Sequence, residues 1–272
     1  MKEKLTIVKV GGAVVEDEAQ LTRLLKDFTA IEGAKILVHG GGRRATAIAS
    51  QLGIETRMVN GRRVTDADML QVVTMVYGGL VNKNIVARLQ ALGENAVGLT
   101  GADAGIIRSV RRPPVTLEER GERREEREAV VVDYGFVGDV TAVAGQTLAR
   151  FIDSGLTPVI APLTHDGEGH LLNTNADTMA SETAKALAAI YDVTLIYAFE
   201  KPGVLRNADD DTSVIATINR QDFLAYRADG TISGGMLPKI ENALAATDAG
   251  VGRVVITSAT AIDGRQGTII TS

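Results

Sequence analysis

Two short apolar runs that each end in glycines constrain the fold of this chain more than any other feature. Residues 5–12 read LTIVKVGG, an apolar strand closed by Lys9 and then by Gly11 and Gly12, and residues 36–42 read ILVHGGG. Glycine has no Cβ, so the backbone can turn sharply and approach an anion. Ligands of parallel sheets bind beyond the carboxyl ends of the strands. The two loops therefore predict one anion site lined by backbone N–H groups and by Lys9.

The segments around these loops predict the class of fold. Residues 17–30 carry apolar side chains at helical spacing, and the second glycine loop leads into a helix near residues 43–52. A strand–helix–strand–helix order predicts parallel strands joined by right-handed crossovers. Hydrophobic residues make up 45% of the chain and aromatic residues only 4%, so the core must rest on aliphatic side chains. We expect a three-layer α/β/α sandwich with a mostly parallel central sheet, forming one domain over residues 1–272.

The remaining elements are expected from the same patterns. An Asn-Gly pair at residues 60–61 lies between two extended runs and predicts a hairpin. The other expected elements are a helical region over 66–92 that is loosened at two glycines, strands at 96–99, 106–110, 157–161, 193–199, 253–257 and 268–271, and helices at 144–154, 175–189, 220–226 and 236–249.

Residues 111–128 differ in composition from everything around them. The segment contains six arginines and six glutamates and offers almost nothing apolar to bury. We expect a solvated, mobile excursion that lengthens a hairpin between two extended runs. A binding arm is the alternative, but the balanced signs of charge argue against a polyanionic partner.

Composition excludes several classes of function. The formal net charge is −5, which gives no basic field for nucleic acid, and no apolar run approaches the roughly 20 residues of a membrane span. The absence of cysteine excludes thiol nucleophiles and cysteine-bound zinc. The first strand begins within four residues, which leaves no room for a signal peptide, so a cytoplasmic protein is expected. The three histidines, His39, His165 and His170, are expected in loops rather than in catalysis.

Residues 173–177, with the sequence NTNAD, bring two amides and a carboxylate to the start of a helix. Asn175 suits the N-cap and Asp177 the first turn, where the helix dipole favours a negative charge. Capping explains Asn175 as well as a functional role does. It does not explain Asn173, so we expect a functional polar cluster here.

Residues 233–239, with the sequence SGGMLPK, end in a lysine in the first turn of a helix. A positive charge is unfavourable at the N-terminus of a helix, and an anionic ligand would compensate the charge of Lys239 there. Arg63, after the Asn-Gly turn, suits a bidentate clamp on a carboxylate, with a solvated hairpin arginine as the equal alternative. Two glycine loops, two lysines, an Asp and an Arg together predict phosphoryl transfer, which needs positioning and charge neutralisation.

These motifs resemble the amino acid kinase family in their order and spacing. They are KVGG at 9–12, HGGG at 39–42, NGRRVT at 60–65, NTNAD at 173–177 and GGMLPK at 234–239. The resemblance covers nearly the whole chain, and the third and fourth motifs are similar to the branch that phosphorylates N-acetyl-L-glutamate. It implies ATP-dependent phosphorylation of the γ-carboxylate of that substrate in arginine biosynthesis. Mg²⁺ is then expected mainly on the nucleotide phosphates, with no metal held by the protein itself.

The resemblance also implies roles for particular residues. Lys9 and Lys239 would stabilise the transferring phosphoryl group, and Asp177 would orient both lysines. The implied substrate-binding residues are Gly41, Gly42, Arg63, Asn173 and Asn175, the phosphate-binding residues Gly11, Gly12 and Gly41, and the nucleotide-binding residues Glu200, Lys201, Gly203, Val204, Leu205, Thr231 and Ser233. Residues 1–190 would form an acylglutamate-binding lobe and residues 191–272 a nucleotide-binding lobe.

A homodimer is expected as well. Arginine-inhibited relatives carry an additional N-terminal helix that links dimers into hexamers, whereas this sequence starts directly at the first strand. We therefore expect a dimer that is insensitive to arginine. The apolar stripe in the 66–92 helical region is the expected interface, with ordinary core as the alternative. It consists of Met69, Val72, Val73 and Val76.

One departure and several alternatives remain. The family usually has Thr or Ser and then Asp where this chain has Phe199 and Glu200, which puts the nucleotide contacts there in doubt.

A dinucleotide-binding oxidoreductase would need the absent G-x-G-x-x-G spacing. A non-catalytic amino-acid sensor would be favoured by loss of a lysine or of the Asp, and all three are present. N-succinylglutamate or another amino acid stays open as substrate. Arg43, Arg44 and Arg62 are candidate partners for a second carboxylate, although we expect N-acetylglutamate, with Arg62 facing water.

Overall fold

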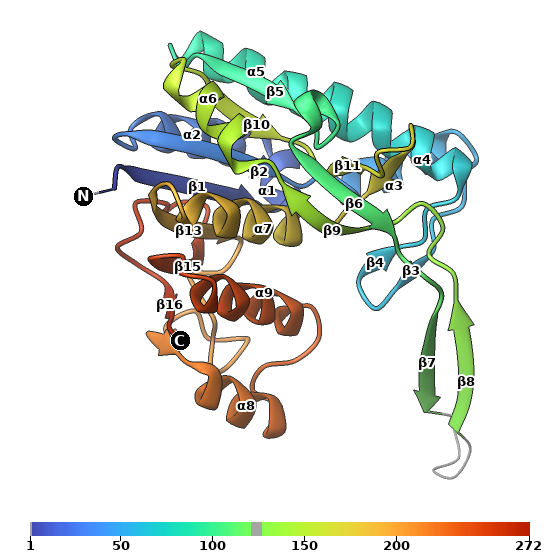
Figure 1. Cartoon of the computed structure of the whole chain (residues 1–272). Coiled ribbons are helices and arrows are strands. Elements are labelled where there is room, and N and C mark those ends of the chain that lie inside the picture. Colours follow the sequence, from blue (N-terminus) through green and yellow to red (C-terminus); the bar gives the residue numbers. More distant parts are fainter. Residues whose placement is uncertain (1, 121–126) are drawn as a thin grey trace.

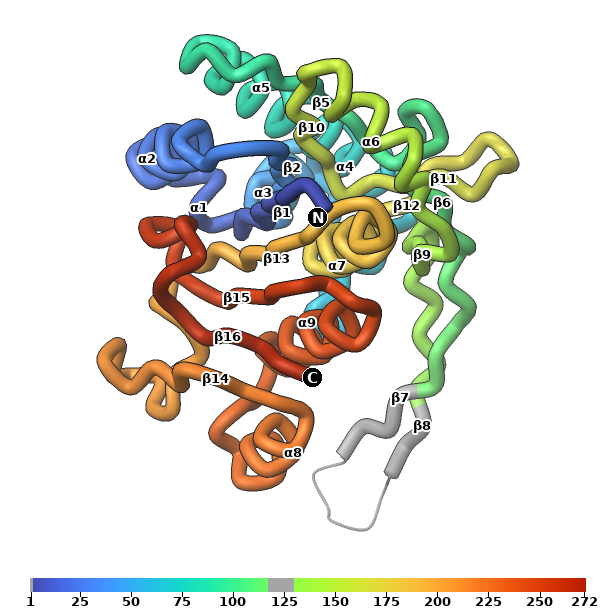
Figure 2. Tube along the Cα trace, turned by 60° about the vertical axis from the view of Figure 1, so that its left-hand side comes forward, coloured from blue at the N-terminus to red at the C-terminus, as the bar shows by residue number. Residues whose placement is uncertain are grey.

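An eight-stranded sheet forms the centre of the protein in a computed structural model that describes residues 2–120 and 127–272. In spatial order its strands are β14 (Thr217–Ile218), β16 (Thr268–Ile270), β15 (Arg253–Ser258), β13 (Asp192–Phe199), β1 (Lys4–Val10), β2 (Ala34–His39), β10 (Thr157–Ile160) and β5 (Ala96–Leu99). Figure 2 shows them in this order from bottom to top. All neighbours are parallel except β15 and β16. The predicted mostly parallel sheet is confirmed.

Helices cover both faces of this sheet (Figure 1). One face carries α6 (Gly145–Asp153), α7 (Ala176–Ala188), α8 (Arg220–Ala228) and α9 (Met236–Asp248). The other carries α1 (Gly12–Glu16), α2 (Glu18–Thr29), α3 (Gly42–Gln51), α4 (Ala67–Val73), the π-helix η1 (Thr74–Val81) and α5 (Asn82–Ala91). The three-layer sandwich is therefore confirmed.

Strand β1 shows how sequence phase assigns side chains to the two layers. Leu5 and Ile7 belong to the core under α6–α9, whereas Val8 and Val10 belong to the core under α1–α5. Alternate residues of a strand point to opposite faces. Lys9 shares the phase of Ile7, so its side chain lies on the side of α7 and α9.

A second, four-stranded sheet flanks the main one. Its strands are, in order, β12 (Leu171–Asn173), β11 (Leu163–His165), β6 (Ile107–Arg111) and β9 (Gly138–Val143). A short 3-10 helix, η2 (Asp103–Gly105), precedes β6. The predicted hairpin is formed by β3 (Met58–Val59) and β4 (Arg62–Arg63), where Asn60 and Gly61 have φ angles of 47° and 73°. Two successive positive φ angles match the type I′ turn that Asn-Gly favours.

The charged segment is more regular than its composition predicts. Strands β7 (Val115–Arg120) and β8 (Arg127–Val132) pair antiparallel and project from the body (Figure 1). Val115 at the base packs against a small cluster that contains Val132 and Tyr134. The predicted lengthening of a hairpin is confirmed for these strands, because cross-strand pairing satisfies the backbone even where side chains are charged. The mobility of the segment stays a prediction. The predicted excursion also includes residues 121–126, which lie outside the described residues.

The long helical region contains a further correction. Met69 and Val76 are 1% exposed, and Val72 and Val73 are fully buried. The stripe is core, because it faces the sheet, and it is not an exposed interface. The glycine pair lies in the π-helical turn η1, where the sequence predicted loosening. Strands β9, β11 and β14 and the short helix α1 were not predicted.

No helix in the described part of the chain is long and apolar enough to cross a membrane.

Candidate active site

Two lysines from different elements meet at one carboxylate. Lys9 lies on β1, Asp177 is in the first turn of α7, and Lys239 is in the first turn of α9. The Lys9 Nζ lies 2.6 Å from one oxygen of Asp177, and the Lys239 Nζ lies 3.8 Å from the other. Lys9 and Asp177 are 6% and 8% exposed. The carboxylate therefore holds two ammonium groups at one edge of the cavity described below.

The pKa of Lys239 reflects this environment. Burial lowers it below the ordinary value, the Asp177 carboxylate opposes that change, and the nearby Lys9 charge lowers it further. Two positive groups share one negative group, so the site carries a net positive charge. Such an arrangement favours a polyanion that enters between the ammonium groups.

The two glycine loops pack backbone against backbone. The Gly40 nitrogen donates to the Val10 carbonyl at 3.0 Å, and a Cβ on Gly40 would lie only 3.0 Å from the Gly12 nitrogen. Gly41 is the N-cap residue of α3, whose first N–H groups lack helical partners. The predicted convergence of the loops at one end of the sheet is thus seen in the structure, together with a helix N-terminus suited to an anion.

His39 is hydrogen-bonded to the second glycine loop. It is fully buried as the last residue of β2, so its expected place in a loop was wrong. Its Nδ1–H donates to the Gly40 carbonyl at 2.8 Å, and its Nε2 accepts from the Asn82 amide at 3.1 Å. Burial is the main reason that its pKa falls to about 4. The imidazole is therefore neutral at pH 7, and it orients the loop.

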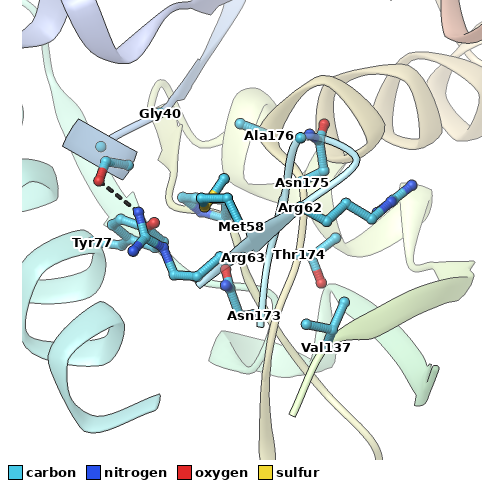
Figure 3. Close-up of a pocket in the computed structure, with 14 residues that line it drawn as sticks. Gly40, Met58, Arg62, Arg63, Tyr77, Val137, Asn173, Thr174, Asn175 and Ala176 are labelled. Carbon is cyan, nitrogen blue, oxygen red and sulfur yellow. Dashed lines mark hydrogen bonds between the residues drawn. The ribbon is translucent and has the colours of Figure 1, made fainter. Parts of the chain in front are cut away.

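Arg63 is buried without an acidic partner among the described residues. It is 7% exposed, and its guanidinium donates to the Gly42 carbonyl at 2.8 Å (dashed in Figure 3) and to the Thr46 hydroxyl at 2.9 Å. A second nitrogen donates to the Thr56 hydroxyl at 3.3 Å. A buried guanidinium is costly unless an anion compensates it. The arrangement therefore favours an anionic ligand beside the glycine loop.

The NTNAD motif divides its work between capping and the pocket. The Asn175 amide oxygen accepts from the backbone nitrogens of Asp177 and Thr178, so it caps α7. The Asn173 amide donates to the Thr65 hydroxyl at 3.0 Å, and its residue is 8% exposed. Both asparagines also line the cavity of Figure 3, on the side opposite the glycine loop.

Two adjoining cavities connect these groups. The first, about 160 Å³, is lined by the second glycine loop, the β3–β4 hairpin, Tyr77 and the segment from Asn173 to Ala176. The second, about 520 Å³, is lined by Lys9, Lys239, both glycine loops, Phe199 and Glu200. Gly42, Met58, Gly61 and Arg63 border both. A ligand in the first cavity can therefore face a phosphoryl donor in the second.

Comparison with known proteins identifies the family. Residues 4–258 match the amino acid kinase family over most of the chain. The chain belongs to the amino acid kinase family. A protein of Bacteroides thetaiotaomicron described as acetylglutamate kinase is 62% identical over 270 residues, which cover 99% of each chain. One of Cytophaga hutchinsonii with the same description is 52% identical over 257 residues, 94% of this chain and 92% of the other. A crystal structure of a Streptococcus mutans protein matches with a TM-score of 0.77 and 27% identity over 98% of both chains.

The nucleotide-binding residues expected from the amino acid kinase resemblance have mixed surroundings. Glu200 lines the larger cavity and lies 3.9 Å from the Arg43 guanidinium. Lys201 pairs with Asp211 at 2.8 Å. Val204 is buried in the core, and its backbone N–H and carbonyl are bonded to Thr268 and Ile215. We therefore leave Val204 out of the proposed nucleotide site.

The other members of this set lie in exposed or tightly turned segments. Gly203 is in close contact with Thr268, where a Cβ would lie 2.9 Å from the hydroxyl. Leu205 forms a β-bridge with Val214. The Thr231 nitrogen donates to Asp229, and the Ser233 carbonyl accepts from the first residue of α9. Thr231 and Ser233 lie just before α9, which carries Lys239, whereas Gly203 and Leu205 lie between β13 and β14.

Sequence reasoning missed several residues that the amino acid kinase fold brings into the cavities, among them Tyr77, Met58 and Phe199. Tyr77 packs on the second glycine loop, where a Cβ on Gly41 would lie 3.0 Å from its ring. Met58 borders both cavities, and Phe199 lines the larger one. Only Phe199 had a sequence signal, as the departure at the end of its strand.

The donor set fits a metal carried by the nucleotide. Asp177 is engaged by two lysines, and Glu200 lies near Arg43. The described residues offer one cluster of carboxylates and histidine, Asp166, Glu168 and His170, on the β11–β12 turn. These three do not line either cavity. A protein-bound metal at the two lysines would lack the oxygen ligands that Mg²⁺ prefers.

Proposed function

We propose that the chain transfers the γ-phosphoryl group of ATP to the γ-carboxylate of N-acetyl-L-glutamate in arginine biosynthesis. Relatives up to 62% identical over 99% of the chain, described as acetylglutamate kinase, support the activity. The observation that carries it is the Asp177 carboxylate between Lys9 and Lys239, beside a cavity that also borders buried Arg63.

The smaller cavity is the proposed acylglutamate site. Arg63 would bind a substrate carboxylate bidentately, which compensates a guanidinium that has no acidic partner in the described part of the chain. Asn173 supplies an amide on the opposite wall, and Gly41 and Gly42 supply backbone N–H groups. Asn175 contributes to this wall mainly by holding the first turn of α7.

The transfer itself needs little covalent chemistry from the protein. An oxygen of the substrate γ-carboxylate forms a bond to the γ-phosphorus, the bond from phosphorus to the bridging oxygen breaks, and ADP leaves. The nucleophile is already ionised, so no general base is required. Lys9 and Lys239 neutralise charge on the phosphoryl oxygens, Gly11 and Gly12 offer N–H groups, and Asp177 keeps both ammonium groups in place.

The nucleotide side completes the proposal. ATP would lie with its γ-phosphate in the larger cavity and its remainder along Glu200, Lys201, Gly203, Leu205, Thr231 and Ser233. Mg²⁺ on its phosphates would neutralise part of their charge, while the Asp177 carboxylate stays engaged by the two lysines. Residues 1–190 and 191–272 would then act as acylglutamate-binding and nucleotide-binding lobes that share one continuous sheet.

A hydroxamate assay tests the proposal. Purified protein is mixed with ATP, MgCl₂, hydroxylamine and N-acetyl-L-glutamate, and the acyl phosphate is trapped as its hydroxamate. We expect ATP-dependent product with N-acetylglutamate and far less with L-glutamate or L-aspartate. No product with any acylated glutamate would overturn the proposal.

N-succinyl-L-glutamate is a second candidate substrate, because Arg62, which was expected to face water, is only partly exposed. Its side chain is half-buried and lines the smaller cavity (Figure 3). Burial, and then the nearby Arg112 charge, lower its pKa, and Asp139 and Tyr134 offset only part of this decrease. A second substrate carboxylate would compensate this charge. Arg44 lines a different cavity, so it is a matched control for the pocket arginine.

The two acyl groups are compared by kcat/KM on the protein and on two variants. If the succinyl compound is the substrate, it is preferred at least about tenfold, and Arg62→Ala abolishes the preference while Arg44→Ala keeps it. A preference for the acetyl compound that Arg62→Ala leaves unchanged supports N-acetylglutamate.

We also propose that the protein is a cytoplasmic homodimer. With the predicted stripe buried, the candidate contact lies on the outer side of the same helical region. Met75 and Leu80 of η1 are 55% and 44% exposed there. Two large apolar side chains exposed on the same short helix support a contact with a second copy.

A further inference from the structure

Phe199 presents one aromatic ring to both lysines of the proposed site. The Lys9 Nζ lies 4.9 Å from the ring centroid and the Lys239 Nζ lies 4.8 Å from it. Both distances fall within the range of about 6 Å in which a ring face attracts a cation. Phe199 is the last residue of β13, the direct neighbour of β1, and its side chain lines the larger cavity.

The charges around the ring explain why a neutral aromatic group matters here. Two ammonium groups face a single carboxylate, and the Lys9 charge lowers the pKa of Lys239. A second carboxylate would bind both lysines, but it would also repel the phosphates of a nucleotide. The ring face carries only partial negative charge, so it stabilises cations while it leaves the site attractive to polyanions.

The ring is held in place by its own neighbours. Phe199 stacks on Tyr197, with ring centroids 6.2 Å apart and ring planes 3° from parallel. The Tyr197 hydroxyl donates to the backbone carbonyl of Asp177 at 3.3 Å. The aromatic pair therefore links the strand to the same turn of α7 that carries the carboxylate.

We propose that Phe199 is a positioning residue, whose ring face attracts the ammonium groups of Lys9 and Lys239 and directs them into the cavity. The expected effect on phosphoryl transfer rests on the proposed function, whereas the placement of the ring beside the two ammonium groups rests on geometry alone. Each ammonium group has three N–H donors, so contact with the ring leaves donors free for phosphoryl oxygens. A leucine would fill part of the space without attracting the cations.

Fluorination of the ring tests the inference while its shape is almost unchanged. Phenylalanine carrying one, two or three fluorine atoms is incorporated at position 199, which removes the partial negative charge of the face stepwise. The matched control is the same series at Phe151 of α6, which packs on the same core cluster. No cation lies over the Phe151 ring among the described residues.

The first readout does not depend on activity. The lysine pKa values are measured by NMR on protein with ¹³C-labelled lysine, and the two resonances are assigned with Lys9→Arg and Lys239→Arg variants. We expect the pKa of Lys239 to fall progressively by about 0.5 to 1.5 pH units along the series at 199. It should not change along the series at 151. Equal values across the series at 199 would overturn the inference.

The second readout is the pH profile of kcat in the hydroxamate assay. The alkaline limb should move to lower pH along the series at 199, with KM for the acylglutamate unchanged. An inactive unmodified protein would refute the proposed function, while the NMR titration would still decide the inference. If a fluorinated protein fails to fold, Phe199→Tyr and Phe199→Leu replace it. Tyr should keep the pKa, and Leu should lower it. A Leu variant with an unchanged pKa would contradict the role of the ring.

Discussion

At the scale of single residues, the proposed chemistry rests on two ammonium groups that one carboxylate binds. We expect Lys9→Ala and Lys239→Ala each to lower kcat by at least about 10²-fold, because each removes a charge that is most needed in the transition state. Binding of the acylglutamate should change less than turnover. Lys26→Ala on the exposed side of α2 is the control and should leave kcat unaltered. Steady-state kinetics on variants with unchanged circular dichroism measure the effect, and near-normal turnover of Lys239→Ala would refute the site.

His39 gives the protein a stability that depends on pH. Its pKa falls from 6.5 in the unfolded chain to about 4 in the fold, chiefly through burial. Between these values the unfolded chain binds more protons than the folded protein. The contribution of His39 to the free energy of unfolding is therefore fully present above pH 6.5 and is lost as the pH falls towards 4. We expect this residue to cost about 2 kcal/mol of stability between pH 7 and pH 5.

Urea denaturation at both pH values measures this loss. His39→Asn keeps a donor at the position of Nδ1 but does not titrate, so it should lose less stability than the unchanged protein over the same interval. Equal losses in the two proteins would show that His39 does not carry the dependence.

At the scale of elements, the projecting hairpin separates into a packed base and a charged outer part. Val115 and Val132 at the base pack in the small third core cluster. Replacing residues 119–128 by Asn-Gly would join Glu118 to Ala129, which already face each other across the ladder. We expect the melting temperature to change by less than about 3 °C, because the packed base is retained. Val132→Ala, in contrast, should lower it measurably. Calorimetry on both variants checks this, and a large drop on trimming would show that the outer part packs.

Elements with strong periodicity were predictable, and short ones were not. The glycine loops, α7 and α9 follow from apolar runs that end in glycine or cap residues. The meeting of Lys9 and Lys239 at Asp177 was implied by the resemblance to the amino acid kinase family. Strands β14 and β11 are two and three residues long, too short for any alternation to be visible. Tyr77 could not be recognised as a site residue, because an aromatic side chain in an apolar segment has the same pattern whether it packs in the core or lines a cavity. Phe199 was marked only by its departure from the family pattern.

At the scale of the whole molecule, we expect two copies to associate through η1. Sedimentation should give twice the 28.7 kDa of one chain. Charges at the exposed apolar residues, in a Met75→Asp and Leu80→Asp double variant, should reduce the mass to that of a monomer, because burying unpaired carboxylates in an interface is unfavourable. Leu224→Asp, at the equally exposed Leu224 of α8, is the control and should remain a dimer. A protein that sediments as a monomer at micromolar concentration would contradict this expectation.

Strands that are neighbours in the sheet are synthesised at different times. β1 is made first, but its neighbour β13 begins only at Asp192, so one edge of β1 stays unpaired while the ribosome produces almost two hundred residues. Unpaired strand edges are sites of aggregation, and a nascent chain must keep this one covered or transiently unfolded. Lys239 emerges later still. The first strand to be synthesised, β1, and the last helix, α9, therefore have to come together before any phosphoryl group can be transferred. A chain that ends prematurely has the exposed strand edge but not the activity.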